Sequence, residues 1–206
     1  MTAPDCALSG GFWPVSVKRT AVDFATTFRE CYMQQSASTI RAGVLTISDK
    51  GSRGLREDES GQVAAELLRG KGYVVAKQDI VPDERDRIAQ TLRNWADDEQ
   101  LALIITSGGT GLTPRDVTPQ ATRSVIDYEV PGMAEAMRAE SLKKTPHAML
   151  SRAVAGVRGT CLIINLPGSP RGARENLEAV LPALDHGLAK LAGDPSDCAT
   201  QPSDKT

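Results

Sequence analysis

The residues of this chain that could do chemistry begin with the loop Gly108-Gly-Thr-Gly111, which follows an apolar run. Glycines let backbone N–H groups approach phosphate oxygens without a Cβ in the way. Asp116 comes five residues later and could hold a magnesium ion that neutralises those oxygens. Two simpler interpretations stay open, namely a tight strand-to-helix turn for the glycines and an Asx turn for Asp116. The spacing matches neither a Walker A loop nor a dinucleotide fingerprint.

A second carboxylate, Asp83, follows Pro82 and precedes an amphipathic segment. With Asp86 three residues further on, Asp83 has the pattern of a helix N-cap, and capping alone would explain its position. Asp83 and Asp116 nevertheless each follow a different apolar run by a few residues, so both could face one edge of a sheet. Two carboxylates from separate loops suit a Mg²⁺ ion that is shared with a triphosphate.

Other polar residues near the ends of apolar runs have both structural and functional interpretations. Thr118 is a good N-cap candidate, and a capped helix N-terminus is also an anion site. The segment Asn165–Ser169 is either a turn or a binding lip for a polar heterocycle. The acidic run Glu57–Glu59 is most simply a solvated loop. Three arginines could meet phosphates, although solubility explains them equally well: Arg53, Arg56 and Arg115.

Apolar runs alternate with amphipathic segments, and this alternation determines the elements that we expect to position these residues. Leu101–Thr106 lacks polar alternation and Cys161–Leu166 is another apolar run, which is typical of strands buried on both faces. Buried strands are predicted at Ala42–Ser48, Tyr73–Val81, Leu101–Thr106 and Cys161–Leu166. Helices are predicted over about 60–70, from Asp83 past Trp95, over Thr118–Asp127, over Pro131–Leu142 and after Pro170 with a kink at Pro182, while Pro146–Val157 reads as less regular.

This order of elements predicts βαβ units around a mostly parallel sheet. In such sheets ligands bind beyond the carboxyl ends of the strands. Four predicted strands end in polar or glycine-rich loops, and in a parallel sheet these loops would converge on one edge. They are Ser48-Asp49, Pro82-Asp83, Gly108–Gly111 and Pro167–Pro170.

Composition limits the class of protein and its partners. The 206 residues suffice for one sizeable domain, which we place at 41–192, between a poorly ordered extension over 1–40 and a flexible tail over 193–206. The net charge of −2 argues against a nucleic-acid partner, and no apolar stretch is long enough to span a membrane. The four cysteines form no CxxC pair, which argues against a zinc site and fits a reducing cytoplasm.

Several motifs, in order, resemble the molybdopterin adenylyltransferase family of the MogA/MoaB type. They are Thr46–Asp49, Val81–Glu84, Thr106–Gly111, Pro114–Pro119, Pro131–Met133 and Asn165–Pro170. The resemblance covers about residues 41–192. It implies a three-layer α/β/α sandwich that assembles as a homotrimer or a hexamer. The implied reaction is the Mg²⁺-dependent transfer of AMP from ATP to molybdopterin, with release of pyrophosphate and possible hand-over of the product to a molybdenum-inserting enzyme.

The resemblance also implies roles for particular residues. Asp83 and Asp116 would be the catalytic, metal-holding carboxylates, and Gly108, Gly109, Thr110 and Gly111 would hold phosphate. The residues that would line the pterin or substrate cleft are Ser48, Asp49, Thr118, Ser151, Pro167, Gly168 and Ser169. Two alternatives stay open, a non-catalytic MoaB-like pterin-binding or scaffolding oligomer and an unrelated nucleotide-binding α/β enzyme.

Overall fold

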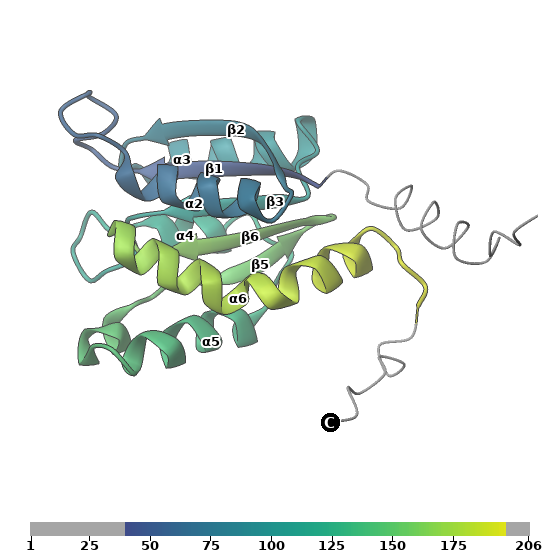
Figure 1. The fold of residues 1–206 in the computed structure, drawn as a ribbon. Helices are drawn as coiled ribbons and strands as arrows, with labels where there is room; N and C mark the ends of the chain where they lie inside the picture. The colour runs from purple at the N-terminus through teal and green to yellow at the C-terminus, as the bar shows by residue number, and fades with distance from the viewer. Residues whose placement is uncertain (1–39, 197–206) are drawn as a thin grey trace, which may run out of the picture. The chain divides into compact units, whose positions relative to one another are not determined.

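A six-stranded sheet forms the centre of the computed structural model, which describes residues 40–196 (Figure 1). The strand order is β2-β1-β3-β6-β5-β4. The strands are β1 (Arg41–Ile47), β2 (Val74–Val81), β3 (Leu103–Ser107), β4 (Tyr128–Glu129), β5 (Ala155–Arg158) and β6 (Cys161–Leu166). The expectations for residues 1–39 and 197–206 lie outside the described residues and stay predictions, as do the domain bounds.

The sheet is mostly parallel, as the alternation of elements predicts. Strand β1 pairs in parallel with β2 and β3, and β3 pairs in parallel with β6. Strands β5 and β4 add an antiparallel edge beside β6. The sequence does not predict these two strands, which are short and have no apolar run that sets them apart.

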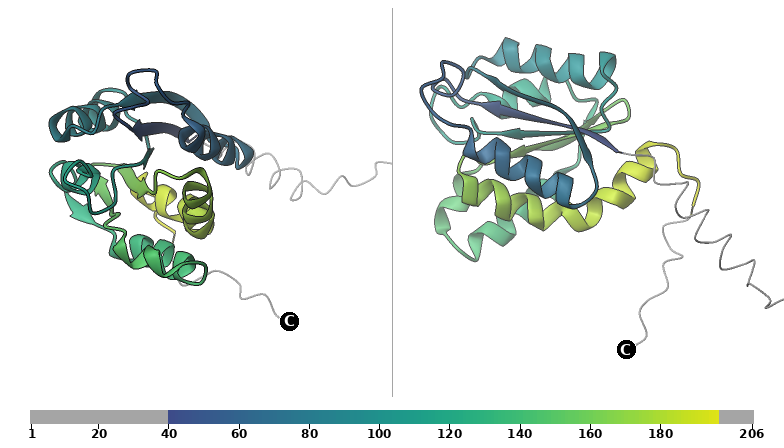
Figure 2. Two further views of the ribbon diagram at one scale, coloured as in Figure 1. Left: turned by 90° about the vertical axis from the view of Figure 1, so that its left-hand side faces the viewer. Right: turned by 45° about the horizontal axis from the view of Figure 1, so that its top comes forward.

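Helices cover both faces of the sheet (Figure 2), which confirms the predicted three-layer α/β/α fold. One face packs against α2 (Glu59–Gly70), α5 (Pro131–Leu142) and α6 (Pro170–Leu191). The other packs against α3 (Arg85–Arg93), the π-helical turn η1 (Asn94–Asp98) and α4 (Thr118–Arg123). Successive residues of the central strands enter opposite cores, so the strands are buried on both faces.

Trp95 belongs to the second core, as predicted from its place on an apolar helical face. Its side chain is 7% exposed and lies directly over β1. A Cβ on Gly43 of that strand would come within 2.6 Å of the indole ring. This approach therefore requires glycine at position 43.

Two predicted helix caps are wrong. The residue before α3 is Glu84, and its side chain makes no capping bond, while Asp83 lies one residue further upstream. The residue before α4 is Val117, so Thr118 is already helical and its hydroxyl does not cap the helix. Both side chains instead contact neighbouring loops at the carboxyl edge of the sheet.

The remaining helices largely follow the predicted ranges. Helix α5 has the predicted bounds, and α4 is shorter than the predicted Thr118–Asp127. Helix α6 contains Pro182 and changes direction near its middle (Figure 1). A 3-10 turn, η2 (Pro146–Leu150), follows α5. Within residues 40–196, we find no helix with both the length and the apolar character needed to cross a membrane.

Candidate functional site

The loops that follow the four parallel strands meet at the carboxyl edge of the sheet. The backbone N–H of Ser48, after β1, donates to the carbonyl of Val81 at the end of β2, at 2.9 Å. The N–H of Gly108, after β3, donates to the carbonyl of Leu166 at the end of β6, at 3.1 Å. The hydroxyl of Ser107 donates to the carbonyl of Pro167 at 3.0 Å. The predicted convergence of these loops is therefore present.

The glycine loop packs so closely on its neighbours that side chains do not fit at two positions. Gly108 has φ +106°, and a Cβ there would lie 2.4 Å from the carbonyl oxygen of Ile47. Gly109 has φ +63°, and a Cβ there would lie 2.3 Å from the hydroxyl of Thr118. These contacts are what a tight turn requires, and they leave the phosphate-binding interpretation open.

Asp83 is joined to Asp49 by two reciprocal hydrogen bonds. The backbone N–H of Asp49 donates to Oδ2 of Asp83 at 2.8 Å, and the N–H of Asp83 donates to Oδ1 of Asp49 at 3.2 Å. The other oxygen of Asp83, Oδ1, lies 3.3 Å from the position of a Cβ on Gly109. Burial raises the pKa of the Asp83 carboxyl above its usual value, and the charges of Asp49 and Asp116 raise it further.

Asp49 is also held by Arg115. The Nε of Arg115 donates to Oδ2 of Asp49 at 3.0 Å, and Nη2 donates to Oδ1 and Oδ2 at 2.7 and 2.8 Å. These bonds hold the pKa of the Asp49 carboxyl below its usual value. Arg115 is therefore more than a solubility residue, although its side chain stays 57% exposed.

Asp116 lies against the other end of the glycine loop. Its Oδ2 accepts from the backbone N–H of Thr113 at 2.7 Å and lies 3.1 Å from the position of a Cβ on Gly111. The carboxylate thus closes a turn over residues 113–116, and it does not form an Asx turn at the start of α4. Asp83 and Asp116 contact the loop at Gly109 and at Gly111, so the structure brings the two carboxylates to one loop.

Two cavities flank the glycine loop. One of about 340 Å³ is lined by Ser48, Gly108, Gly109, Gly168, Ser169 and residues around the start of α2. The other, of about 390 Å³, is lined by Thr110, Gly111, Ser151, Pro167 and Ser169, together with residues of α5, η2 and α6. The predicted cleft residues Asp49 and Thr118 line neither of these two cavities, and the same holds for Asp83 and Asp116.

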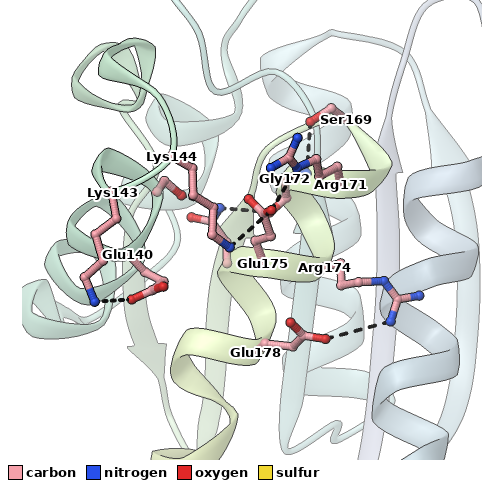
Figure 3. Close-up of polar contacts among 11 residues, drawn as sticks. Glu140, Lys143, Lys144, Ser169, Arg171, Gly172, Arg174, Glu175 and Glu178 are labelled. Atoms are coloured by element: carbon pink, nitrogen blue, oxygen red, sulfur yellow. Dashed lines mark hydrogen bonds and ion pairs between the residues drawn. The ribbon is translucent and has the colours of Figure 1, made fainter.

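Three cationic residues and one glutamate line the larger cavity. Its cationic lining residues are Arg138, Lys144 and Arg171. Glu175 accepts from Nε of Arg171 at 2.8 Å and forms an ion pair with Nζ of Lys144 at 3.1 Å (Figure 3). Ser169 caps α6 by accepting from the N–H of Gly172 at 3.1 Å (Figure 3). Two of the three cations already pair with Glu175, so it is the N-terminus of α6 and Arg138 that favour an anionic ligand here.

Asn165 does not form part of a polar lip. Its side chain is fully buried and donates to the hydroxyls of Thr106 and Thr122, both at 2.9 Å. It therefore ties β6 to β3 and α4 beneath the loops. The residue is the fifth of a six-residue buried strand, so a binding lip could involve only the rest of the segment, which ends at Ser169.

Asp58 was assigned to a solvated loop, and that prediction is wrong. Its Oδ1 accepts from the N–H of Gly61 at 2.8 Å, which caps α2, and its Oδ2 accepts from the hydroxyl of Thr46 at 2.7 Å. Asp58 also lines the smaller cavity. An aspartate just before an amphipathic segment is a known N-cap signal that could have identified it.

The protein side chains alone do not form a complete metal centre. Within residues 40–196, no three or more His, Cys, Asp or Glu side chains are grouped so that they could hold a metal ion. Mg²⁺, however, usually keeps several waters and takes one or two carboxylates plus substrate phosphates. The hard oxygen donors of Asp83, beside Gly109, and of Asp116, beside Gly111, fit that requirement.

The fold and the site define an α/β domain with a glycine loop and two carboxylates at the carboxyl edge of a mostly parallel sheet. Residues 43–186 match the family described as "Probable molybdopterin binding domain". Because the match spans more than half of the chain, the protein belongs to this family, as its motifs predict.

Relatives of this chain carry related names. A molybdopterin adenylyltransferase of Helicobacter pylori (strain J99) is 45% identical over 159 residues, which are 75% of this chain and 89% of that relative. The molybdopterin adenylyltransferase of Escherichia coli (strain K12) is 41% identical over 157 residues, 73% of this chain and 80% of that relative. By their names, both relatives are nucleotidyltransferases.

A solved structure gives the same fold. The crystal structure of the molybdopterin biosynthesis enzyme MoaB from Thermus thermophilus is 57% identical, with a TM-score of 0.72. The match covers 77% of this chain and 99% of that chain.

Proposed function

We propose that this protein is a molybdopterin adenylyltransferase of molybdenum cofactor biosynthesis. It transfers AMP from ATP to the terminal phosphate of molybdopterin and releases pyrophosphate. The observation that carries the proposal is the glycine loop Gly108–Gly111, which lies between two cavities and is contacted by Asp83 and Asp116. The names of the relatives support the same activity.

The chemistry of this reaction fits the residues of the site. Attack of one phosphate on the α-phosphorus of ATP brings two anions together, so catalysis depends on positioning and on charge neutralisation. The backbone N–H groups of Gly108, Gly109, Thr110 and Gly111 would bind phosphate oxygens. Asp83 and Asp116 would hold Mg²⁺, which when bound neutralises phosphate charge. No protein nucleophile is required.

The two cavities would hold the two substrates on opposite sides of the glycine loop. Ser48, Gly168 and Ser169 would line one side, and Ser151, Pro167 and Ser169 would line the other. Ser169 contributes to both cavities and therefore lies where the two substrates would meet. The attacking and attacked phosphates would then face each other near the loop and the two carboxylates.

The remaining expectations go with this proposal. The protein would act in the cytoplasm as a homotrimer or a hexamer and pass adenylylated molybdopterin to a molybdenum-inserting enzyme. A non-catalytic pterin carrier is less well supported, since a carrier has no need for two carboxylates at a phosphate loop. The relatives carry the name of an enzyme as well.

Pyrophosphate release tests this proposal. Purified protein with Mg-ATP should release pyrophosphate only when molybdopterin is present, and omission of Mg²⁺ should stop the release. Tight pterin binding without pyrophosphate release would instead establish the carrier function. A thermal shift with plain nucleotides, without any shift for the pterin, would indicate a different nucleotide-binding enzyme.

A further inference from the structure

Asp49 joins three loops that carry the proposed catalytic groups. It lies in the loop after β1, and its backbone N–H and its Oδ1 both bond to Asp83 in the loop after β2. Its carboxylate also accepts three hydrogen bonds from Arg115 in the loop after β3. The residue next to Arg115 is Asp116. Asp49 therefore connects the loop of one proposed catalytic carboxylate to the loop of the other.

The bonding of Asp49 leaves little capacity for a substrate. Its Oδ1 accepts from the N–H of Asp83 and from Nη2 of Arg115, and its Oδ2 accepts twice from Arg115. These bonds argue against the substrate-cleft role that the family resemblance implies for Asp49.

Arg115 bonds to the Asp49 carboxylate through two nitrogens, Nε and Nη2, and we call this arrangement the Arg115 fork. The fork gives the link between the loops a defined geometry. Guanidinium and carboxylate groups that bond through two nitrogens are fixed in orientation as well as in distance. The backbone of residues 113–116 is closed by the bond from Thr113 to Asp116, so a fixed Arg115 also fixes the Asp116 turn. Arg152 donates from its side chain to the carbonyls of Gly111 and Asp116, which also anchors the end of the same turn.

We propose that Asp49, held by Arg115, is a positioning residue that sets the placement of the Asp83 carboxylate relative to the Asp116 turn. The inference rests on the proposed adenylyltransferase function. Asp49 does not contact the reacting atoms. It acts through its two bonds to Asp83 and through the Arg115 fork.

A second ion pair in the chain offers a matched control. Arg158 donates to Asp97 from Nε at 2.8 Å and from Nη2 at 2.6 Å, so it forms the same kind of fork. Arg158 ends β5 next to the start of β6, and Asp97 lies in η1 before β3. This pair is therefore at the opposite edge of the sheet from the site. Asp97→Asn breaks a second guanidinium–carboxylate pair that also bonds through Nε and Nη2, without touching the proposed catalytic loops.

The kinetic test compares Asp49→Asn, Arg115→Gln, their double variant and Asp97→Asn. Displacing a reacting group by about 1 Å can cost about 100-fold in rate, so we expect kcat to fall about 10- to 100-fold in each single site variant. The double variant should be no slower than the slower single variant, because both changes break one connection. The KM for ATP should change less than about threefold, while Asp97→Asn should keep the kcat of the native protein.

Two kinetic outcomes would overturn the inference. A rise of tenfold or more in the KM for ATP in Arg115→Gln, with kcat unchanged in Asp49→Asn, would make Arg115 a direct phosphate contact. Multiplicative losses of kcat in the double variant would show that Asp49 and Arg115 act independently.

An amide measurement tests the positioning without relying on turnover. In ¹H–¹⁵N spectra, Arg115→Gln should shift the amide signals of Asp49 and Asp83, while Asp97→Asn should leave both in place. Unchanged Asp49 and Asp83 signals in Arg115→Gln would refute the connection. If the native protein shows no adenylylation but the amide signals shift as expected, the proposed function fails while the connection among the three loops holds.

Discussion

The hydroxyl of Thr118 occupies the space that a side chain on Gly109 would need. A Cβ on Gly109 would lie 2.3 Å from Oγ1 of Thr118, and that hydroxyl donates to the carbonyl of Gly108 at 2.9 Å. The backbone N–H of Thr118 also donates to the carbonyl of Gly109 at 3.2 Å. The first residue of α4 therefore holds the glycine loop in place from below.

Replacing Gly109 should disturb the loop in two ways, through backbone strain and through a collision with Thr118. Gly109→Ala adds a Cβ that collides with Thr118 and also lies 3.3 Å from Oδ1 of Asp83. Gly159→Ala is the matched control, since Gly159 has a similar φ of +55° with nothing within 4 Å of its Cβ position. The left-handed conformation alone costs about 1–2 kcal/mol in each variant. We expect Gly109→Ala to be the less stable in urea unfolding and the only one to lose ATP binding. Equal loss of stability in both variants would contradict this account.

For stability and nucleotide affinity, the buried hydroxyl of Thr118 should matter more than the shape of the Thr118 side chain. Thr118→Val keeps the shape but leaves the carbonyl of Gly108 without this donor, and an unsatisfied buried group costs about 1–3 kcal/mol. Thr118→Ser keeps the hydroxyl and should restore most of the nucleotide affinity. Denaturant unfolding and equilibrium binding of an ATP analogue measure the two effects. Equal nucleotide affinity in the Val and Ser variants would show that the hydroxyl does not organise the loop.

Asp58 should contribute to stability through two bonds. Asp58→Ala removes the N-cap of α2 and the acceptor of the Thr46 hydroxyl, and the lost cap alone costs about 0.5–2 kcal/mol. Asp58→Asn can still cap and should retain most of that stability. Thermal unfolding of the two variants measures the difference. If the alanine variant is as stable as the native protein, Asp58 behaves as a solvated loop residue and its two bonds do not stabilise the fold.

Cys161 should be chemically inert in the folded protein. Burial raises the pKa of its thiol to about 12, from the ordinary value of 9.0. Its neutral form therefore contributes stability that is complete below about pH 9 and is lost as the pH rises toward 12. The thiol therefore stays protonated near neutral pH, and the thiolate is the reactive form. Peptide mapping after iodoacetamide treatment should find Cys161 unmodified in the native protein and modified in guanidinium. Rapid native labelling would disprove its burial.

The sequence predicts the elements with long apolar runs well. Strand β6 and helix α5 have the bounds that their patterns indicate, and β1 is displaced by one residue. Strands β4 and β5 were missed because Tyr128–Glu129 and Ala155–Arg158 are too short to show a period. Strand β5 pairs with β6 and β4 pairs with β5, and these pairings are tertiary interactions that a local pattern does not encode.

Side-chain roles at the site are harder to predict than elements. Asp83 has the sequence pattern of an N-cap, yet its carboxylate accepts from Asp49, which is 34 residues away along the chain. Thr118 likewise bonds to Gly108 instead of capping its own helix. Local patterns cannot reveal these partners because the bonds form only when separate loops meet at the sheet edge. The family motifs identified the residues, and the structure shows which of them contact one another.

The central claim is that Asp83 and Asp116 serve adenylyl transfer rather than folding. Neither side chain caps a helix. Burial raises the pKa of the Asp83 carboxyl because it disfavours the charged form, so Asp83→Asn should be at least as stable as the native protein near pH 7. A carboxamide is a far weaker magnesium ligand than a carboxylate, so either substitution should remove most of the metal affinity.

The most direct measurement follows AMP transfer from α-labelled ATP to molybdopterin with Mg²⁺, by native protein and by Asp83→Asn and Asp116→Asn. We predict labelled adenylyl-molybdopterin and equimolar pyrophosphate from the native protein. Each variant should retain its cooperative unfolding and lose at least about 100-fold in rate, as is usual when a charge-stabilising group is removed. Native protein that forms no labelled product, or folded variants that transfer AMP at the native rate, would contradict the account.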